Sequence, residues 1–257
     1  MVDLPDPLHV AGLTKMYGSR TGVQNVSFDV RQGEVTGLLG PNGSGKSTTI
    51  HCITGFIEPT EGQILIGGAK HSTLPAKDFF GFFPDDLPIP ESLTGTETVG
   101  FYRRLRPVFD DFLAQRLLEL LGLEGHMDKY VGAYSHGMKR KLQLVLALAH
   151  HPRLLVLDEP MRGLDPEAGM LMNVILKTFV QDGGAALVAT HDLLAAQHYC
   201  DSVVILAGGA VVSSGAPARL MSQSGTGSLE ELFIRATGLE DTMKGKEDEL
   251  RSLLVSL

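Results

Sequence analysis

The stretch "GLLGPNGSGKSTTI" (Gly37–Ile50) decides the fold, because it joins two patterns of regular structure through a loop of small residues. The apolar run "EVTGLLG" (Glu34–Gly40) leads into it as a strand, and "SGKSTTIHCIT" continues from it as a helix. Glycines between them allow backbone conformations that other residues rarely adopt. The segment therefore predicts a strand, a tight loop and a helix in that order.

This loop carries the chemistry of phosphate binding. From Gly40 to Ser47 it fits the pattern G-x-x-x-x-G-K-[ST]. In such a loop the backbone N–H groups form a concave nest around an anion, and the N-terminus of the next helix adds partial positive charge. We expect Lys46 to contact the β- and γ-phosphates of a nucleotide and the Ser47 hydroxyl to ligate Mg²⁺.

An acidic segment far along the chain agrees with a nucleotide site. The apolar run "LLVLDEP" ends on Asp158 and Glu159. Ligands of open α/β sheets bind at the C-terminal ends of the strands, where these two acids are expected. Asp158 suits the Mg²⁺ shell, and Glu159 is placed to orient or deprotonate an attacking water.

Strand and helix patterns alternate along the chain, which favours a parallel sheet. From Glu97 to Ala149 the pattern is helical, as an insertion would be. We therefore expect an α/β fold: a P-loop NTPase (RecA-like) core, an inserted α-helical subdomain and an N-terminal antiparallel β region. The expected strands are Leu8–Leu13, Val26–Val30, Gln63–Gly68, Arg153–Glu159, Ala185–Thr190 and Ser202–Leu206, with a helix over Ala168–Val180 and a hairpin or edge strand over Gly208–Pro217.

Composition limits the class of protein. The chain has 257 residues, 43% of them apolar, and a formal net charge of −8 at pH 7. A negative chain does not suit general nucleic-acid binding, which needs a positive face. Cys52 and Cys200 form no disulfide framework, and no apolar run is long enough to span a bilayer. We expect a soluble, cytoplasmic protein.

Several motifs occur in a fixed order. The segment Tyr134–Pro166 reads "YSHGMKRKLQLVLALAHHPRLLVLDEPMRGLDP", "ATHD" spans Ala189–Asp192, and "MYG" spans Met16–Gly18. With the phosphate loop, these motifs resemble the signature motif, Walker B strand, D-loop, switch histidine and aromatic loop of ATP-binding cassette (ABC) transporter subunits. The resemblance covers nearly all of residues 8–220.

The resemblance implies roles for individual residues. Tyr17 would stack on adenine, and His191 would bond the γ-phosphate and the attacking water. Ser135 and Gly137 would reach the γ-phosphate held by a second copy of the cassette, and Asp165 would line the joint between the copies. The triphosphate would be held by Gly40, Pro41, Asn42, Gly43, Ser44, Gly45, Lys46, Ser47 and Thr48.

The chain departs from the family pattern at three places. Asp85 stands where a glutamine that touches Mg²⁺ is usual, so it would ligate the ion directly, bridge to it through water or serve only as a turn residue; Asp86 is the alternative acid. His136 stands within the signature motif. Arg162 stands in the D-loop approach, either solvated or paired with an acid across the dimer.

We expect three domain ranges: an ABC ATPase domain over 1–220, as the resemblance implies, an inserted helical subdomain with the signature motif over 87–152, and a helical tail over 221–257. The tail carries one apolar stripe, which fits either packing on its own domain or a partner contact. Its members are Leu250, Leu253, Leu254 and Leu257.

The resemblance implies an ATPase that dimerises around two ATP molecules, with Mg²⁺, and powers a separate membrane permease, most like the two-component (ABC-2 type) exporters. The partner cassette would be a second copy or a paralogue, and the location the cytoplasmic face of the membrane. Asp86–Pro107 would help form the groove for a permease helix, with Phe101, Tyr102, Arg103 and Arg104 as contacts or as ordinary helix surface. Two alternatives stay open: a soluble ABC ATPase of an assembly or regulatory complex, and a non-enzymatic ATP-gated dimer module.

Overall fold

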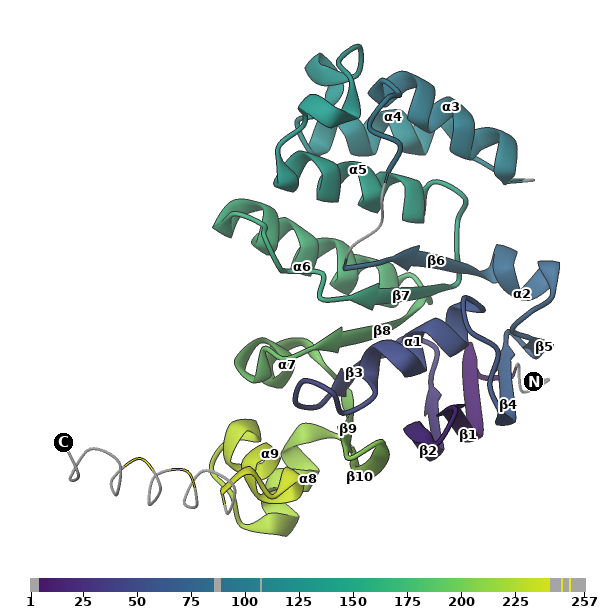
Figure 1. Cartoon of the computed structure of the whole chain (residues 1–257). Coiled ribbons are helices and arrows are strands. Elements are labelled where there is room, and N and C mark those ends of the chain that lie inside the picture. The colour runs from purple at the N-terminus through teal and green to yellow at the C-terminus, as the bar shows by residue number, and fades with distance from the viewer. Residues whose placement is uncertain (1–4, 86–88, 107, 241–245, 247–249, 251–257) are drawn as a thin grey trace.

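Figure 1 shows the computed structural model, which describes residues 5–85, 89–106, 108–240, 246 and 250. The N-terminal part forms an antiparallel sheet in the order β2-β1-β4-β5. Its strands are β1 (Leu8–Tyr17), β2 (Arg20–Val30), β4 (Glu61–Ile66) and β5 (Ala69–Lys70). Alternating burial along β2 fits a sheet with one face in the core. The expected N-terminal antiparallel region is confirmed.

The central sheet has six strands in the order β10-β9-β3-β8-β7-β6. Neighbouring strands from β9 to β6 pair in parallel, and β10 pairs with β9 in an antiparallel hairpin at the edge. The strands are β3 (Val35–Leu39), β6 (Phe80–Phe83), β7 (Leu154–Asp158), β8 (Ala185–Thr190), β9 (Ser202–Ala207) and β10 (Ala210–Gly215). Every residue of β3, β7 and β8 is buried, as continuous apolar runs predict for strands covered on both faces.

Helices cover the central sheet and form the insertion above it in Figure 1. The insertion between β6 and β7 contains α3 (Gly95–Leu105), α4 (Asp111–Leu120) and α5 (His136–Leu148), with short 3-10 turns at Glu124–His126 and Val131–Ala133. The remaining helices are α1 (Lys46–Thr54), α2 (Leu74–Phe79), α6 (Pro166–Gln181), α7 (Leu193–Tyr199), α8 (Pro217–Ser224) and α9 (Leu229–Thr237). The α/β class with a helical insertion is confirmed.

Strand β3 packs in two hydrophobic clusters, and this packing fixes the point at which the phosphate loop begins. Val35 and Leu39 pack in the cluster that includes α5, α6 and α9, whereas Leu38 packs in the cluster that includes α1 and the antiparallel sheet. Neighbouring residues of a strand point to opposite faces, so one short strand joins both clusters. The loop that follows it therefore starts from a fixed point.

The structure adds elements that the sequence analysis did not predict: strands β5 and β6 and helices α2, α7 and α8. Helix α9 lies within the helical tail expected over 221–257. Helix α8 runs across the expected boundary at residue 220, and Leu229, Leu232 and Phe233 of α9 are buried in a main cluster. The expected leucine stripe of the tail lies outside the described residues except for Leu250, and Asp86 lies outside them too. Of the helices in the described part of the chain, none is long and apolar enough to cross a membrane.

Candidate active site

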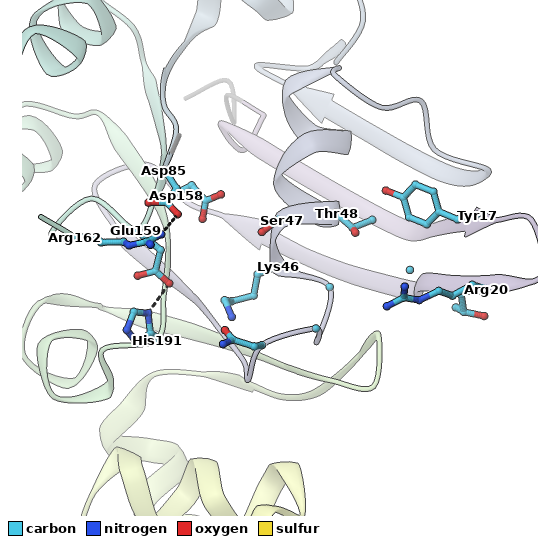
Figure 2. A pocket seen from close by; sticks show the side chains of 15 residues that line it. Tyr17, Arg20, Lys46, Ser47, Thr48, Asp85, Asp158, Glu159, Arg162 and His191 are labelled. Atoms are coloured by element: carbon cyan, nitrogen blue, oxygen red, sulfur yellow. Dashed lines mark hydrogen bonds and ion pairs between the residues drawn. The ribbon is translucent and has the colours of Figure 1, made fainter. Parts of the chain in front are cut away.

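A cavity of about 810 Å³ opens at the C-terminal ends of β3 and β7. Figure 2 shows Tyr17 and Arg20 at one end of it and Glu159 with His191 at the other, with Lys46 between them. The phosphate loop and the acidic segment, more than a hundred residues apart in sequence, thus face one space. The residues that line it are Tyr17, Arg20, Thr21, Gly22, Asn42, Gly43, Gly45, Lys46, Ser47, Thr48, Asp85, Asp158, Glu159, Arg162 and His191.

The loop needs glycine at two positions for steric reasons. Gly45 has φ of 106°, and a Cβ there would lie 2.3 Å from Cγ1 of Val23. A Cβ on Gly40 would lie 2.6 Å from the carbonyl oxygen of Leu206. Larger residues would thus push the loop away from the strands beneath it. Pro41 and Ser44 belong to the same loop without lining the cavity, and Ser44 is buried.

Lys46 is held across this loop. Its Nζ donates to the carbonyl oxygen of Gly40 at 2.5 Å and to that of Pro41 at 3.3 Å. Burial lowers the pKa of the Lys46 amine, and the carboxylates of Glu159 and Asp158 oppose that shift. The side chain is therefore already folded back over the nest in which a phosphate would sit.

The N-terminus of α1 is open to an anion. Its N-cap residue is Gly45, so no side chain accepts hydrogen bonds from the first N–H groups of the helix. Those N–H groups need an acceptor, and a phosphate oxygen supplies one at the positive end of the helix. The loop, Lys46 and this helix terminus together fit the triphosphate of a nucleotide.

The β1–β2 turn forms the other end of the cavity. Tyr17 is 44% exposed, and a Cβ on Gly22 would lie 2.8 Å from Cε2 of its ring, so the ring rests on the bare backbone of β2. Nζ of Lys15 lies 5.5 Å from the centre of the ring. Such an open aromatic face suits a flat heterocycle. The sequence analysis did not identify Arg20, the cross-strand neighbour of Tyr17, as a lining residue.

Glu159 and His191 meet at the ends of adjacent strands. Nδ1 of His191 lies 2.8 Å from Oε1 of Glu159, and the hydroxyl of Thr190 donates to Oε2 at 3.2 Å. Glu159 itself has a positive φ of 47°, which is uncommon for a residue with a side chain. Parallel pairing of β7 and β8 brings the two predicted residues together, and Figure 2 shows the contact.

Asp158 is buried beside these groups. Burial raises the pKa of its carboxyl to about 6, with smaller contributions from Asp85 and Glu159. Within the described residues, no three His, Cys, Asp or Glu side chains form a set that could hold a metal ion by themselves. Mg²⁺ is usually bound by one or two carboxylates together with substrate phosphates, so Asp158 and the Ser47 hydroxyl fit that donor set.

Two of the departures from the family pattern contact each other. The guanidinium of Arg162 binds Oδ2 of Asp85 within the same chain. Arg162 therefore has an acidic partner in its own chain, which the sequence analysis did not predict, while its side chain remains 61% exposed. His136, the third departure, lies next to this pair. Its ring packs against Gly163, the residue after Arg162, so closely that a Cβ on Gly163 would lie 2.4 Å from Cδ2 of the ring.

Besides Gly40, Pro41 and Ser44 of the phosphate loop, three predicted site residues are not among those that line the cavity: Ser135, Gly137 and Asp165. Ser135 is exposed at the start of α5, where its hydroxyl oxygen accepts from the N–H of Met138 at 3.2 Å. Asp165 caps α6 in the same way, accepting from the N–H of Ala168 at 2.8 Å. The structure thus gives both residues a capping role that the sequence analysis did not predict, although Asp before Pro is a helix-start signal.

Comparison with known proteins gives consistent results. The family described as "ABC transporter" matches residues 23–162. An uncharacterized ABC transporter ATP-binding protein, YdbJ of Bacillus subtilis (strain 168), is 36% identical over 208 residues, which cover 79% of this chain and 67% of YdbJ. The Nod factor export ATP-binding protein I of Burkholderia lata is 35% identical over 224 residues, covering 84% of this chain and 72% of that protein. The solved structure of an ATP-binding subunit of an ABC transporter aligns with a TM-score of 0.84 at 33% identity, covering 90% of this chain and 99% of that one.

Proposed function

The chain belongs to the ABC transporter family of ATP-binding subunits, and from this premise we propose that it powers a separate membrane permease by ATP hydrolysis, with export as the direction of transport. The observation that carries the proposal is the shared cavity. It places the phosphate loop with Lys46 opposite the contact between Glu159 and His191. A site that only bound nucleotide would need the phosphate loop but not the contact between Glu159 and His191.

The roles of the site residues follow from their positions. The loop and Lys46 bind the phosphates, and Tyr17 stacks on the base. Glu159 orders the attacking water and accepts its proton, while His191 holds the Glu159 carboxylate and contacts the γ-phosphate. Catalysis of this kind is positioning and charge stabilisation rather than covalent chemistry.

Mg²⁺, when bound, neutralises charge on the β- and γ-phosphates. Ser47 and Asp158 are its proposed protein ligands. Because Arg162 already binds the Asp85 carboxylate, we assign Asp85 to a water-mediated position rather than to direct ligation.

A second cassette completes the site. Ser135 and Gly137 lie at the exposed start of α5 and do not line the cavity of their own chain. In a two-fold dimer, that helix terminus faces the γ-phosphate in the partner, and Asp165 lies at the joint. ATP then bridges the two copies, and hydrolysis weakens the bridge because ADP lacks the bridging phosphate.

A groove beside β6 supports a permease partner. It has a volume of about 560 Å³ and lies between the core and the insertion. Leu74 and Leu105 line it and are largely exposed, and Tyr102 lies among the lining residues. An apolar groove of this kind takes the apolar face of a helix. Of the other expected contacts, Phe101 is exposed and Arg103 pairs with Asp111 of α4.

A membrane partner would place the chain at the cytoplasmic face of the membrane. The direction of transport rests on similarity to a protein named for Nod factor export. The second candidate is an ABC ATPase of a soluble assembly or regulatory complex, because fold and motifs do not fix the partner.

Co-purification tests this proposal. The tagged full-length chain, expressed in its own host and extracted in mild detergent, should bring down a polytopic membrane protein. Leu74→Glu should abolish the association without changing ATP binding. Val212→Glu is the matched control, because Val212 is also exposed but lies on β10, at the opposite edge of the sheet from the groove. Recovery of soluble partners alone would favour the second candidate.

A further inference from the structure

Arg140 is a buried arginine in the first half of α5, the helix that starts within the signature motif. It is 2% exposed, and its guanidinium carbon lies 4.0 Å from the centre of the Phe83 ring at the end of β6. Taking a guanidinium out of water is costly unless its N–H groups find acceptors. The contacts of Arg140 should therefore show what it holds in place.

The guanidinium binds backbone carbonyls of two separate segments. NH1 donates to the carbonyl oxygen of Pro84 and, at 3.0 Å, to that of Asp85. NH2 donates at 2.7 Å to the carbonyl oxygen of Glu159. Arg140 thus joins the segment that enters the helical insertion to the turn that carries the candidate general base. A lysine has one point of charge and cannot span these positions in the same way.

The turn at Glu159 needs such support. Its positive φ of 47° is unfavourable for a residue with a side chain, and the surrounding structure must hold it there. On one side, the N–H of Glu159 donates to the carbonyl of Ala189 at 2.8 Å. On the other side, Arg140 binds the Glu159 carbonyl. The main chain of this residue is therefore fixed from both sides of the peptide.

We propose that Arg140 is a positioning residue, which transmits the position of the helical insertion to Glu159. A shift of α5 relative to the core moves the guanidinium away from the Glu159 carbonyl and releases the turn. Asp85 and Pro84 move with it, because they are bound by the same group. The consequence for hydrolysis rests on the role proposed for Glu159, whereas the coupling of the two segments does not.

The test compares Arg140→Met and Arg140→Lys with Lys141→Met in the full-length chain. Lys141 is the matched control: its substitution removes the same charge from the next position of α5, where the side chain is only partly buried. Amide hydrogen exchange should rise at least about tenfold in peptides covering residues 84–85 and 159–162 of Arg140→Met. Arg140→Lys should show a smaller rise, and Lys141→Met none.

Two further measurements separate positioning from general damage. The Kd for a fluorescent ATP analogue should stay within about twofold of the parent, because the phosphate loop is untouched, while phosphate release falls at least about tenfold. Unchanged exchange at 159–162, or a rise spread over α1 and β2 as well, would overturn the proposal. If exchange responds but phosphate release does not, the coupling stands and the role of Glu159 is wrong.

Discussion

Arg162 binds the carboxylate of Asp85, and the two residues are 77 positions apart in the chain. Each of them departs from the family pattern, and the structure places the two departures in contact. A neutral amide at position 85 needs no partner, whereas a carboxylate near Asp158 and Glu159 adds a third negative charge to the pocket. Arg162 compensates for that charge, so the two substitutions form one unit.

This pairing predicts non-additive effects on nucleotide binding. Arg162→Gln should weaken Mg·ATP binding by up to about fivefold, because an exposed ion pair contributes little and the uncompensated Asp85 repels the phosphates. Asp85→Asn in that background should restore most of the loss. Equilibrium titration with a fluorescent nucleotide measures both effects.

The control for this cycle is Arg103→Gln. Arg103 pairs with Asp111 at a similarly exposed position, with N–O distance 3.0 Å, but neither residue lines the nucleotide cavity. Binding should be unchanged in this variant. Additive losses from the two substitutions at Asp85 and Arg162 would show that the pair does not act as a unit.

The phosphate loop offers a prediction with a built-in comparison. Gly43 and Gly45 both have positive φ, at 80° and 106°, but only Gly45 would place a Cβ against Val23. Gly45→Ala should reduce ATP affinity at least about a hundredfold and lower the melting temperature, because the loop must move away from β2. Gly43→Ala adds only backbone strain, about 1 kcal/mol.

Isothermal titration and thermal unfolding of both glycine variants test this comparison. Equal losses in the two variants would mean that backbone conformation alone matters at these positions. The steric explanation for Gly45 would then be wrong.

The sequence predicted the parts of the site that lie in one contiguous segment or directly after a strand. It did not predict the parts that depend on contacts between residues far apart in the chain. The phosphate loop is contiguous, and Glu159 and His191 each follow an apolar strand, so their meeting follows from parallel pairing. Arg140 and Arg162 act through partners that only the folded chain brings near, and no local pattern marks those partners. The same holds for Arg20, whose place in the cavity depends on the pairing of β1 with β2.

The missed elements of the fold have physical reasons of two kinds. Strand β6 spans only Phe80–Phe83 and follows α2 directly, so its apolar run is too short to classify from periodicity. Helix α9 lies in the expected helical tail, but its start was not predicted, although Ser228 and Glu231 have the spacing of a capping box and the Ser228 hydroxyl accepts from the N–H of Glu231 at 3.1 Å. The polar composition of the preceding stretch concealed this start.

The contact between Glu159 and His191 leads to a test of the catalytic role. Glu159→Gln should reduce phosphate release at least about a hundredfold, because the amide cannot accept a proton. ATP binding should persist, and ATP should hold the variant as a stable dimer. Size-exclusion chromatography with light scattering detects the dimer, and a phosphate-release assay gives the rate.

Glu167→Gln is the control for that substitution. Glu167 is an exposed carboxylate in the first turn of α6, so its loss changes the net charge equally without touching the cavity. Its rate should match the parent. Near-parental hydrolysis by Glu159→Gln would remove Glu159 from the role of general base.

A buried histidine predicts how stability depends on pH. His150 follows α5, and its Nε2 lies 3.1 Å from the carbonyl oxygen of Phe80, so the neutral ring bonds to the end of α2 and the start of β6. Burial, helped by the charge of Arg106, lowers the pKa of His150 to about 4. The unfolded chain therefore takes up a proton at this residue at a higher pH than the folded chain does.

The sign of the effect follows directly. The contribution of His150 to the free energy of unfolding is fully present above pH 6.5 and is lost as the pH falls towards 4. The complete loss, reached below pH 4, amounts to about 3 kcal/mol. His150→Gln should flatten the pH dependence of urea unfolding between pH 7 and pH 4.5, while His198→Gln, at an exposed position of α7, should leave it unchanged. A parental pH dependence in His150→Gln would mean that the pKa of this ring is not lowered in the folded protein, and the assignment of the pH dependence to His150 would then be wrong.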